Sequence, residues 1–233
     1  MNYSRRTTKK DIGRRILISW LVIAFMFTVI GFGCGWGTKA VLTKRDTKET
    51  TVGTYIAKAS TYGAFKGVDF SEWEDWNADD NNFIPMDDLK ISSDIQEFTY
   101  YLSAAYEIEY SFVLALMQKE SRFDVYAVSS TNDYGLMQIN SCNKDYLNKQ
   151  LGITDLTNPY ENIEGALFIL RGLFDKYDDP SQVLMAYNMG EYGASKLWDK
   201  GIFETSYSKE VLKNQADFIE KLNKLESEVK GND

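Results

Sequence analysis

Histidine is absent from the 233-residue chain, and cysteine occurs only twice. Without an imidazole base, the chain cannot perform Ser-His-Asp or Cys-His catalysis. Most catalytic zinc, non-haem iron and haem sites use histidine ligands, and two cysteines cannot form a four-thiolate zinc site or an iron–sulfur cluster. Carboxylates are plentiful, with 34 Asp and Glu against 26 Lys and Arg. If the protein is an enzyme, we expect its proton chemistry to use Asp, Glu or Tyr.

The net charge of −8 is unevenly distributed. Residues 1–15 carry six basic side chains and one acidic side chain, residues 16–38 carry no charge, and the remainder is strongly acidic. The acidic balance argues against nucleic-acid binding, which needs a basic surface. The uncharged run Ile16–Thr38 reaches about 34 Å as a helix, enough to cross a bilayer.

The positive-inside rule then predicts the membrane topology. Residues 1–15 form a basic cytoplasmic tail, residues 16–38 a single transmembrane helix, and the remainder is extracytoplasmic. A cleaved signal peptide is the alternative, but the apolar run is long for one and no clean small-residue cleavage site follows it. A lipoprotein at Cys34 is disfavoured, because the residues before this cysteine lack the usual pattern.

The polar, acidic residues 39–82 have little periodicity, which predicts a stalk. Residues 83–228 show helical apolar patterns and predict a mainly α domain with a small hairpin. We expect helices over 95–105, from a cap at Ser111 to near Glu120, from 158 onward, over 183–188 and over 211–225. Asn158 and Pro159 form a typical helix start, and Gly190 is expected to end the helix over 183–188. Between Asp124 and Leu156 the pattern predicts no helix.

Three short segments carry groups suited to chemistry: Gln118–Phe123, Ser129–Ser141 and Ala186–Gly190. In the first, an apolar helix runs directly into Glu120, and partial burial there would raise the pKa of the carboxyl group. The second holds amide side chains around Gly135, and the third holds a Tyr-Asn pair before a glycine. Taken singly, each also fits an ordinary helix end or hairpin.

Together, in the order ES…GLMQIN…AYNMG, these segments resemble the SLT-type lytic transglycosylases, relatives of goose-type lysozyme that cleave the glycan strands of bacterial peptidoglycan. The similarity covers about residues 84–225. It includes the helix start at Asn158-Pro159 and the Glu204-Thr205…Tyr207 segment, whose spacing is one residue shorter than usual. The resemblance implies a lysozyme-like α+β domain that needs no metal and no cofactor.

The resemblance also implies the roles of the groups around Glu120. Glu120 protonates the oxygen of the MurNAc-β-1,4-GlcNAc bond and then deprotonates the MurNAc 6-hydroxyl, which gives a 1,6-anhydro product. Ser121 positions Glu120 or the substrate. Tyr187 is expected to hydrogen-bond Glu120, and Tyr207 to reach the same site.

Three further residues are expected to hold the sugars beside the cleaved bond. These are the backbone of Met137 and the side chain of Gln138, with Asn188 binding an N-acetyl sugar. The stretch around Asp133 also resembles that of c-type lysozymes, in which the Asp is the second catalytic carboxylate. Asp133 is therefore either a second acid or an inherited loop residue.

Two alternatives follow for the function: a hydrolytic muramidase that uses Glu120 and Asp133, and a non-catalytic wall-binding assembly protein on the same scaffold. The anchor and stalk favour local cutting of the wall near the membrane. The expected partners are peptidoglycan strands, the membrane through Ile16–Thr38, and the proteins of a conjugation or secretion apparatus. Routine wall remodelling is the second possibility.

Overall fold

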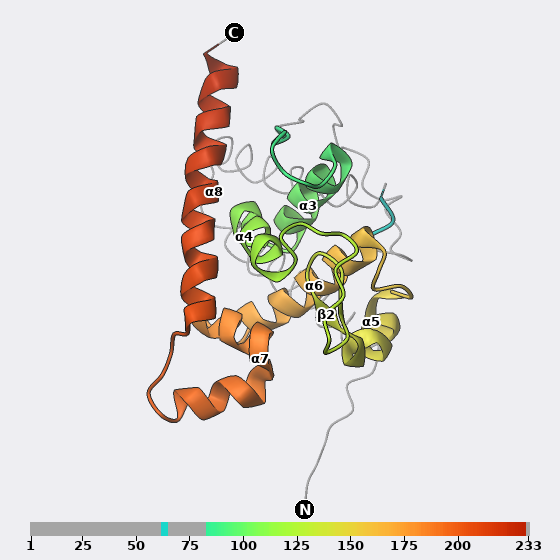
Figure 1. Ribbon diagram of the computed structural model, residues 1–233, viewed down its shortest axis with the longest axis vertical. Coiled ribbons are helices and arrows are strands. Elements are labelled where there is room, and N and C mark those ends of the chain that lie inside the picture. Colours follow the sequence, from blue (N-terminus) through green and yellow to red (C-terminus); the bar gives the residue numbers. More distant parts are fainter. Residues whose placement is uncertain (1–61, 65–82, 232–233) are drawn as a thin grey trace, which may run out of the picture. The chain divides into compact units, whose positions relative to one another are not determined.

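The computed structural model describes residues 62–64 and 83–231 (Figure 1). The predicted cytoplasmic tail, the predicted transmembrane helix and all of the predicted stalk except 62–64 lie outside the described residues. Within those two described ranges, no helix combines the length and apolarity needed to cross a bilayer.

The described part is mainly helical, with one small antiparallel hairpin, as the sequence predicted. Its elements in chain order are α3 Ser93–Ala105, α4 Tyr110–Glu120, β1 Asp133–Tyr134, β2 Ile139–Asn140, a 3-10 turn Ser141–Asn143, α5 Lys144–Leu151, α6 Pro159–Phe174, α7 Pro180–Trp198 and α8 Ser206–Lys230. In the hairpin, Asp133 pairs with Asn140 and Tyr134 with Ile139.

Side-chain caps fix where the helices begin. Asn158 accepts hydrogen bonds from the backbone N–H groups of Tyr160 and Glu161, and Pro159 occupies the first turn of α6, as predicted. The predicted cap at Ser111 is wrong: α4 begins at Tyr110 after Glu109, and no side-chain cap is present. The Ser111 hydroxyl instead donates to the Glu109 carboxylate at 3.4 Å.

Helix α4 forms the centre of the core. All residues from Ser111 to Met117 are buried, and α4 packs against α3 and α8 (Figure 1). Burial of each large apolar side chain stabilises the fold by about 1.5–3 kcal/mol. The helix leaves this core only in its last turn. Its final residue, Glu120, therefore lies at the edge of the apolar interior.

Two helical segments were not predicted from the sequence. Helix α5, in the segment predicted to have no helix, buries only Leu147, so its sequence carries no apolar periodicity. Helix α7 begins at Pro180, earlier than predicted, and its first helical run ends as predicted at Gly190, whose backbone is not helical (φ 73°, ψ 157°). The chain resumes helical geometry up to Trp198, and the second half forms a lobe below α8 (Figure 1).

The aromatic side chain of Tyr62, within the predicted stalk, contacts the domain. Its ring stacks on that of Tyr160 with centroids 5.5 Å apart and meets Phe98 edge-on at 5.6 Å. The hydroxyl of Tyr62 donates to Glu97 Oε2 at 2.9 Å. Tyr62 therefore packs on α3 and α6.

Candidate active site

Glu120 is the last residue of α4, and its carboxyl group accepts a hydrogen bond from the hydroxyl of Tyr207 at Oε1. Burial raises the pKa of Glu120, and the nearby negative charge of Asp133 raises it further. The Tyr207 hydrogen bond and the charge of Lys119 act in the opposite direction, but the net shift is upward. Glu120 therefore holds its proton to a higher pH than an ordinary glutamate, as a general acid requires.

Tyr207 is positioned by the start of α8. Thr205 and Ser208 form a reciprocal capping box there, which fixes the first turn that carries Tyr207. Burial raises the pKa of Tyr207, and the charge of Glu120 adds to this effect. The phenol thus stays protonated and remains a hydrogen-bond donor to Glu120.

Tyr187 does not make the contact expected of it. Its hydroxyl donates to the carbonyl oxygen of Met137 at 2.8 Å, so the predicted hydrogen bond to Glu120 is wrong. Burial, and then the charge of Glu120, raise the pKa of Tyr187. Tyr187 therefore ties α7 to the hairpin, while Tyr207 is the tyrosine that contacts the acid.

The backbone of Met137 is held from both sides. Its N–H donates to Asn162 Oδ1 at 2.9 Å, and its carbonyl accepts from Tyr187. The side-chain amide of Gln138 donates to the carbonyls of Gly135 and Ala127 at 2.9 and 3.1 Å. The sugar-binding roles expected for Met137 and Gln138 stay predictions. Two acceptors are available for a sugar hydroxyl: the second lone pair of the Met137 carbonyl oxygen, and Gln138 Oε1.

Asn162 lies in the helix-start segment that contributes to the resemblance, but the sequence predicted no role in the site for it. Its side chain is fully buried and donates to the carbonyls of Tyr134 and Leu156 at 2.7 and 2.9 Å, besides accepting from Met137. Gly135 (φ 73°) lies so close that an added Cβ would come within 2.7 Å of the Asn162 side chain. One feature of the sequence could have indicated its role: Asn162 is an amide side chain next to Ile163, within the apolar stripe of α6.

Asp133 is bound within the hairpin. Its Oδ2 accepts from Ser129 and Thr131 at 2.6 and 2.5 Å, and its Oδ1 accepts from Asn140 at 2.7 Å. Burial alone would raise the pKa of Asp133, but these three hydrogen bonds together outweigh it and lower the pKa. Asp133 is thus an ionised carboxylate that holds the hairpin and contributes negative charge near Glu120.

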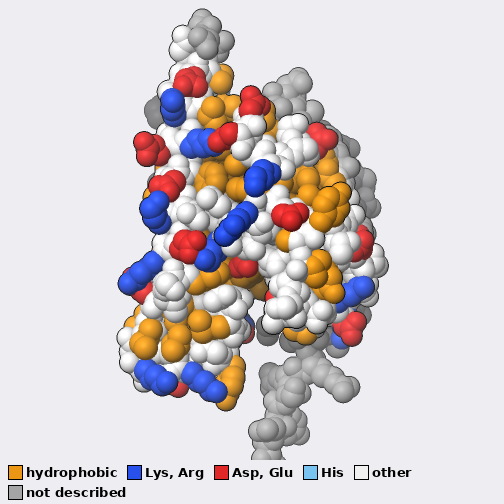
Figure 2. Space-filling model, in the orientation of Figure 1, with side chains coloured by type: hydrophobic (Ala, Val, Ile, Leu, Met, Phe, Trp, Pro, Cys, Tyr) orange, Lys and Arg blue, Asp and Glu red, His pale blue; other side chains and the backbone are white. Residues whose placement is uncertain are grey.

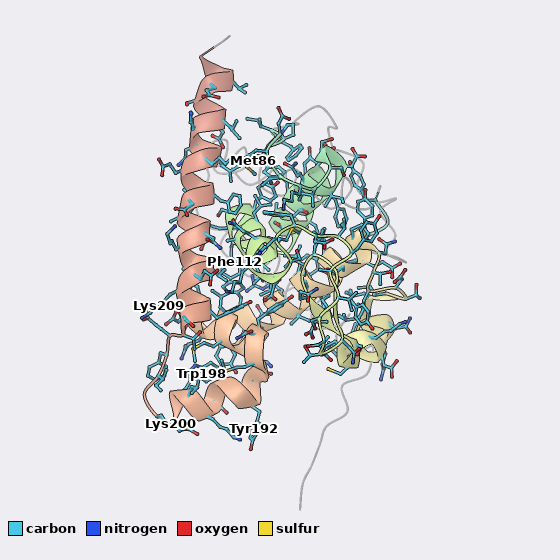
Figure 3. All side chains as sticks on the ribbon, in the orientation of Figure 1. Met86, Phe112, Tyr192, Trp198, Lys200 and Lys209 are labelled. Atoms are coloured by element: carbon cyan, nitrogen blue, oxygen red, sulfur yellow. The ribbon has the colours of Figure 1, made fainter. Side chains whose placement is uncertain are left out.

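The last two expected site residues differ in their surroundings. Ser121 donates to the carbonyl of Met117 at 3.1 Å and so closes the end of its own helix. Asn188 is exposed, two residues before the bend at Gly190. The domain is hollowed between the α7 lobe and the hairpin side (Figure 2). In the lobe, Trp198 lies near α8 and Tyr192 at the outer edge (Figure 3).

No group of three or more Cys, Asp or Glu side chains is placed to hold a metal ion in the part of the chain that the structure describes. The candidate site brings together the carboxyl group of Glu120, the phenols of Tyr187 and Tyr207, and the backbone of the hairpin. These features define a carboxyl-based acid–base site at the edge of a helical domain.

Residues 99–206 match the family model described as "Transglycosylase SLT domain". This match confirms the resemblance of these residues to the SLT-type transglycosylases. The chain is 33% identical over 112 residues to the "Transglycosylase" of Enterobacteria phage PRD1, which covers 48% of this chain and 39% of the relative. It is 33% identical over 113 residues to "Membrane-bound lytic murein transglycosylase C" of Glaesserella parasuis, which covers 42% of this chain and 31% of the relative.

Among solved structures, an inactive mutant of the lytic transglycosylase Slt from Pseudomonas aeruginosa is similar, with a TM-score of 0.48 and 20% sequence identity. The similarity covers 54% of this chain and 24% of that one. The region shared with the two sequence relatives spans 39% and 31% of their length.

Proposed function

We propose that the domain is a peptidoglycan lytic transglycosylase that cleaves MurNAc-β-1,4-GlcNAc bonds. The observation that carries the proposal is the single carboxyl group of Glu120, partly buried at the end of a core helix and held by Tyr207. The similarity of residues 99–206 to the SLT domain supports the same activity.

In the first step, protonated Glu120 donates its proton to the oxygen of the glycosidic bond. The bond between that oxygen and the anomeric carbon breaks, and GlcNAc leaves with a 4-hydroxyl group. The N-acetyl oxygen of MurNAc stabilises the cationic anomeric carbon. Burial of Glu120 favours this step, because it keeps the carboxyl group protonated.

In the second step, the Glu120 carboxylate takes the proton of the MurNAc 6-hydroxyl group. The freed oxygen closes on the anomeric carbon and gives the 1,6-anhydro product, so Glu120 regains its proton and no water is consumed. The hydrogen bond from Tyr207 stabilises the carboxylate form that must exist between the two transfers, and so it favours release of the proton in the first step.

A hydrolytic muramidase with Asp133 as the second carboxylate is the alternative. Both oxygens of Asp133 are engaged by donors from Ser129, Thr131 and Asn140. These three donors stabilise the ionised form and lower the pKa of Asp133, which makes its carboxylate a weaker base toward a water molecule. The hydrogen bonds of Asp133 therefore favour the mechanism with one carboxyl group.

The test compares wild type, Glu120→Gln and Asp133→Asn on purified peptidoglycan, with the released sugars identified by mass spectrometry. We expect Glu120→Gln to abolish release of products while the folded signal in circular dichroism is kept, and Asp133→Asn to retain most activity. A loss in Asp133→Asn as complete as in Glu120→Gln would support the muramidase instead.

We also propose that the chain is anchored in the membrane through Ile16–Thr38, with residues 1–15 in the cytoplasm and the domain outside. The support is the uncharged run of 23 residues after a basic tail and the membrane-bound description of one relative. Carbonate extraction of membranes tests the anchor: the full chain should stay in the pellet, and a chain lacking residues 1–38 should be released.

An anchored domain would cut the wall locally. We propose opening of the wall for a conjugation or secretion apparatus as the purpose, with routine remodelling as the alternative. Deleting the gene and measuring transfer or secretion together with growth rate separates these two purposes. Loss of transfer or secretion at a normal growth rate fits only the conjugation or secretion role.

A further inference from the structure

Four side chains join the end of α4 to the start of α8: Lys119 and Glu120 from α4, and Tyr207 and Glu210 from α8. The Nζ atom of Lys119 donates to Glu210 Oε2 at 2.5 Å and lies 5.7 Å from the centroid of the Tyr207 ring. The hydroxyl group of the same ring donates to Glu120 Oε1. Lys119 therefore contacts the turn of α8 that supplies the hydrogen-bond donor to the candidate acid.

The spacing of these residues in the two helices explains the arrangement. Glu210 follows Tyr207 by three residues, so their side chains lie on one face of α8, about 5–6 Å apart. Lys119 and Glu120 are neighbours in the last turn of α4, and their side chains leave the helix about 100° apart around its axis. Lys119 thus faces the ring of Tyr207, while Glu120 meets its hydroxyl group.

The ion pair between Lys119 and Glu210 is too open to solvent to stabilise the fold strongly. The two side chains are 27% and 53% exposed, and pairs of this kind contribute little to stability. Their effect on geometry is larger, because a ring contacted by Lys119 has fewer orientations open to it. The hydroxyl group of Tyr207 is thereby kept on Glu120, and precise placement of this kind matters for catalysis.

The groups that act on Glu120 or on its hydrogen-bond donor come from four elements: Lys119 of α4, Tyr207 and Glu210 of α8, Tyr187 of α7 and Asp133 of the hairpin. Burial, and then the charge of Asp133, raise the pKa of Glu120, whereas the positive charge of Lys119 lowers it. Loss of this positive charge should therefore raise the pKa of Glu120 further.

We infer that Lys119 is a positioning residue of the reaction: paired with Glu210, it holds the ring of Tyr207 so that the hydroxyl group stays on Glu120. The inference rests on the proposed function for the role of Glu120 as the acid. Lys119 acts through Tyr207, so its loss weakens the acid without removing it.

Kinetics on purified peptidoglycan test the inference with matched variants. We expect Lys119→Met to lower kcat about twofold to fivefold with KM kept, and to move the alkaline limb of the kcat/KM profile to higher pH. Lys119→Arg, which keeps the charge and can form the same pair, should restore the wild-type kcat. Lys213→Met breaks the exposed Lys213–Asp217 pair of α8 and should leave kcat and the pH profile unchanged.

Glu210→Gln separates the ion pair from the charge of Lys119. It breaks the pair but keeps the positive charge beside Glu120, so kcat should still fall. The double variant Lys119→Met/Glu210→Gln should be no slower than Lys119→Met alone, because the pair can be lost only once. A wild-type kcat in Glu210→Gln would overturn the inference.

A double-mutant cycle with Tyr207→Phe tests whether Lys119 acts through the hydroxyl group of Tyr207. The Tyr207→Phe protein has no hydroxyl group to hold on Glu120, so Lys119→Met should lower kcat by a smaller factor there than in the wild-type background. A lysine that interacts only with the dipole at the end of α4 predicts the same factor in both backgrounds. That additive result, or a wild-type kcat in Lys119→Met, overturns the inference.

Titration of Glu120 in the absence of substrate separates the inference from the proposed function. The carboxyl carbon of Glu120 is followed by NMR in the full chain in detergent, and is assigned by its absence in Glu120→Gln. We expect its titration midpoint to lie at higher pH in Lys119→Met and to stay in place in Lys213→Met. An unchanged midpoint in Lys119→Met overturns the inference and leaves the cleavage activity standing. A raised midpoint in a protein that cleaves no peptidoglycan keeps the arrangement around Glu120 and overturns the proposed function.

Discussion

Replacing Tyr207 by phenylalanine tests whether its hydroxyl group controls the protonation of Glu120. The hydroxyl is the hydrogen-bond donor to Glu120 Oε1, and a hydrogen bond to a charged acceptor contributes about 1.5–3 kcal/mol. One pKa unit corresponds to about 1.4 kcal/mol. Because Glu120 is not fully buried, we expect the lower end of this range, so that its pKa rises by about one unit in Tyr207→Phe.

The assay is kcat/KM on purified peptidoglycan as a function of pH. The alkaline limb of this profile reports the loss of the proton from the general acid in the free enzyme. We expect this limb to move up by about one pH unit in Tyr207→Phe, because burial continues to favour the protonated form while the opposing hydrogen bond is gone. We also expect kcat to fall, because Glu120 without this hydrogen bond is a weaker acid and gives up its proton less readily in the first step.

Tyr192→Phe is the matched control, since Tyr192 is 75% exposed at the outer edge of the α7 lobe (Figure 3). Its profile should coincide with that of wild type. An alkaline limb that stays in place or moves to lower pH in Tyr207→Phe would refute the account, because neither result fits a hydrogen bond that stabilises the carboxylate.

Three further predictions concern stability. The raised pKa of Glu120 means that its ionisation costs folding free energy above that pKa, so Glu120→Gln should raise the free energy of unfolding at neutral pH, and the gain should vanish below the ordinary value of 4.5. Asp133→Asn should lower the free energy of unfolding by about 1 kcal/mol at neutral pH. This loss should fade as the pH falls through the lowered pKa of Asp133, because protonation then removes the same ionic hydrogen bonds from the wild-type protein. Asn162→Ala should cost about 3 kcal/mol in urea unfolding, since it leaves a buried N–H and two carbonyls unpaired; an unchanged midpoint would show that the amide does not hold the hairpin.

The sequence predicted the parts of the fold that follow from apolar periodicity and capping. Helix α6 begins at the Asn158-Pro159 pair as expected, and α4 ends at Glu120. Helix α5 escaped prediction because Leu147 is its only fully buried residue. The helical run up to Trp198 escaped prediction because it follows the break that Gly190 was correctly expected to make, where a new helix starts directly.

The candidate site was predictable in its residue types but not in its pairings. Motifs brought Glu120, Tyr187 and Tyr207 together, yet the helix packing that decides which hydroxyl meets the carboxyl group is absent from local sequence. Tyr207 occupies the first turn of α8, which packs on α4, and so it contacts Glu120. Tyr187 faces the hairpin carbonyl of Met137 instead.

The mass of the sugar ends that the wild-type protein releases from purified peptidoglycan decides between the one-carboxyl mechanism and hydrolysis. Closure of the MurNAc 6-hydroxyl on the anomeric carbon consumes no water. We therefore expect 1,6-anhydroMurNAc ends, lighter by one water than reducing ends, and no product from Glu120→Gln. Reducing MurNAc ends from the wild-type protein would contradict the one-carboxyl mechanism and would assign hydrolysis to the site.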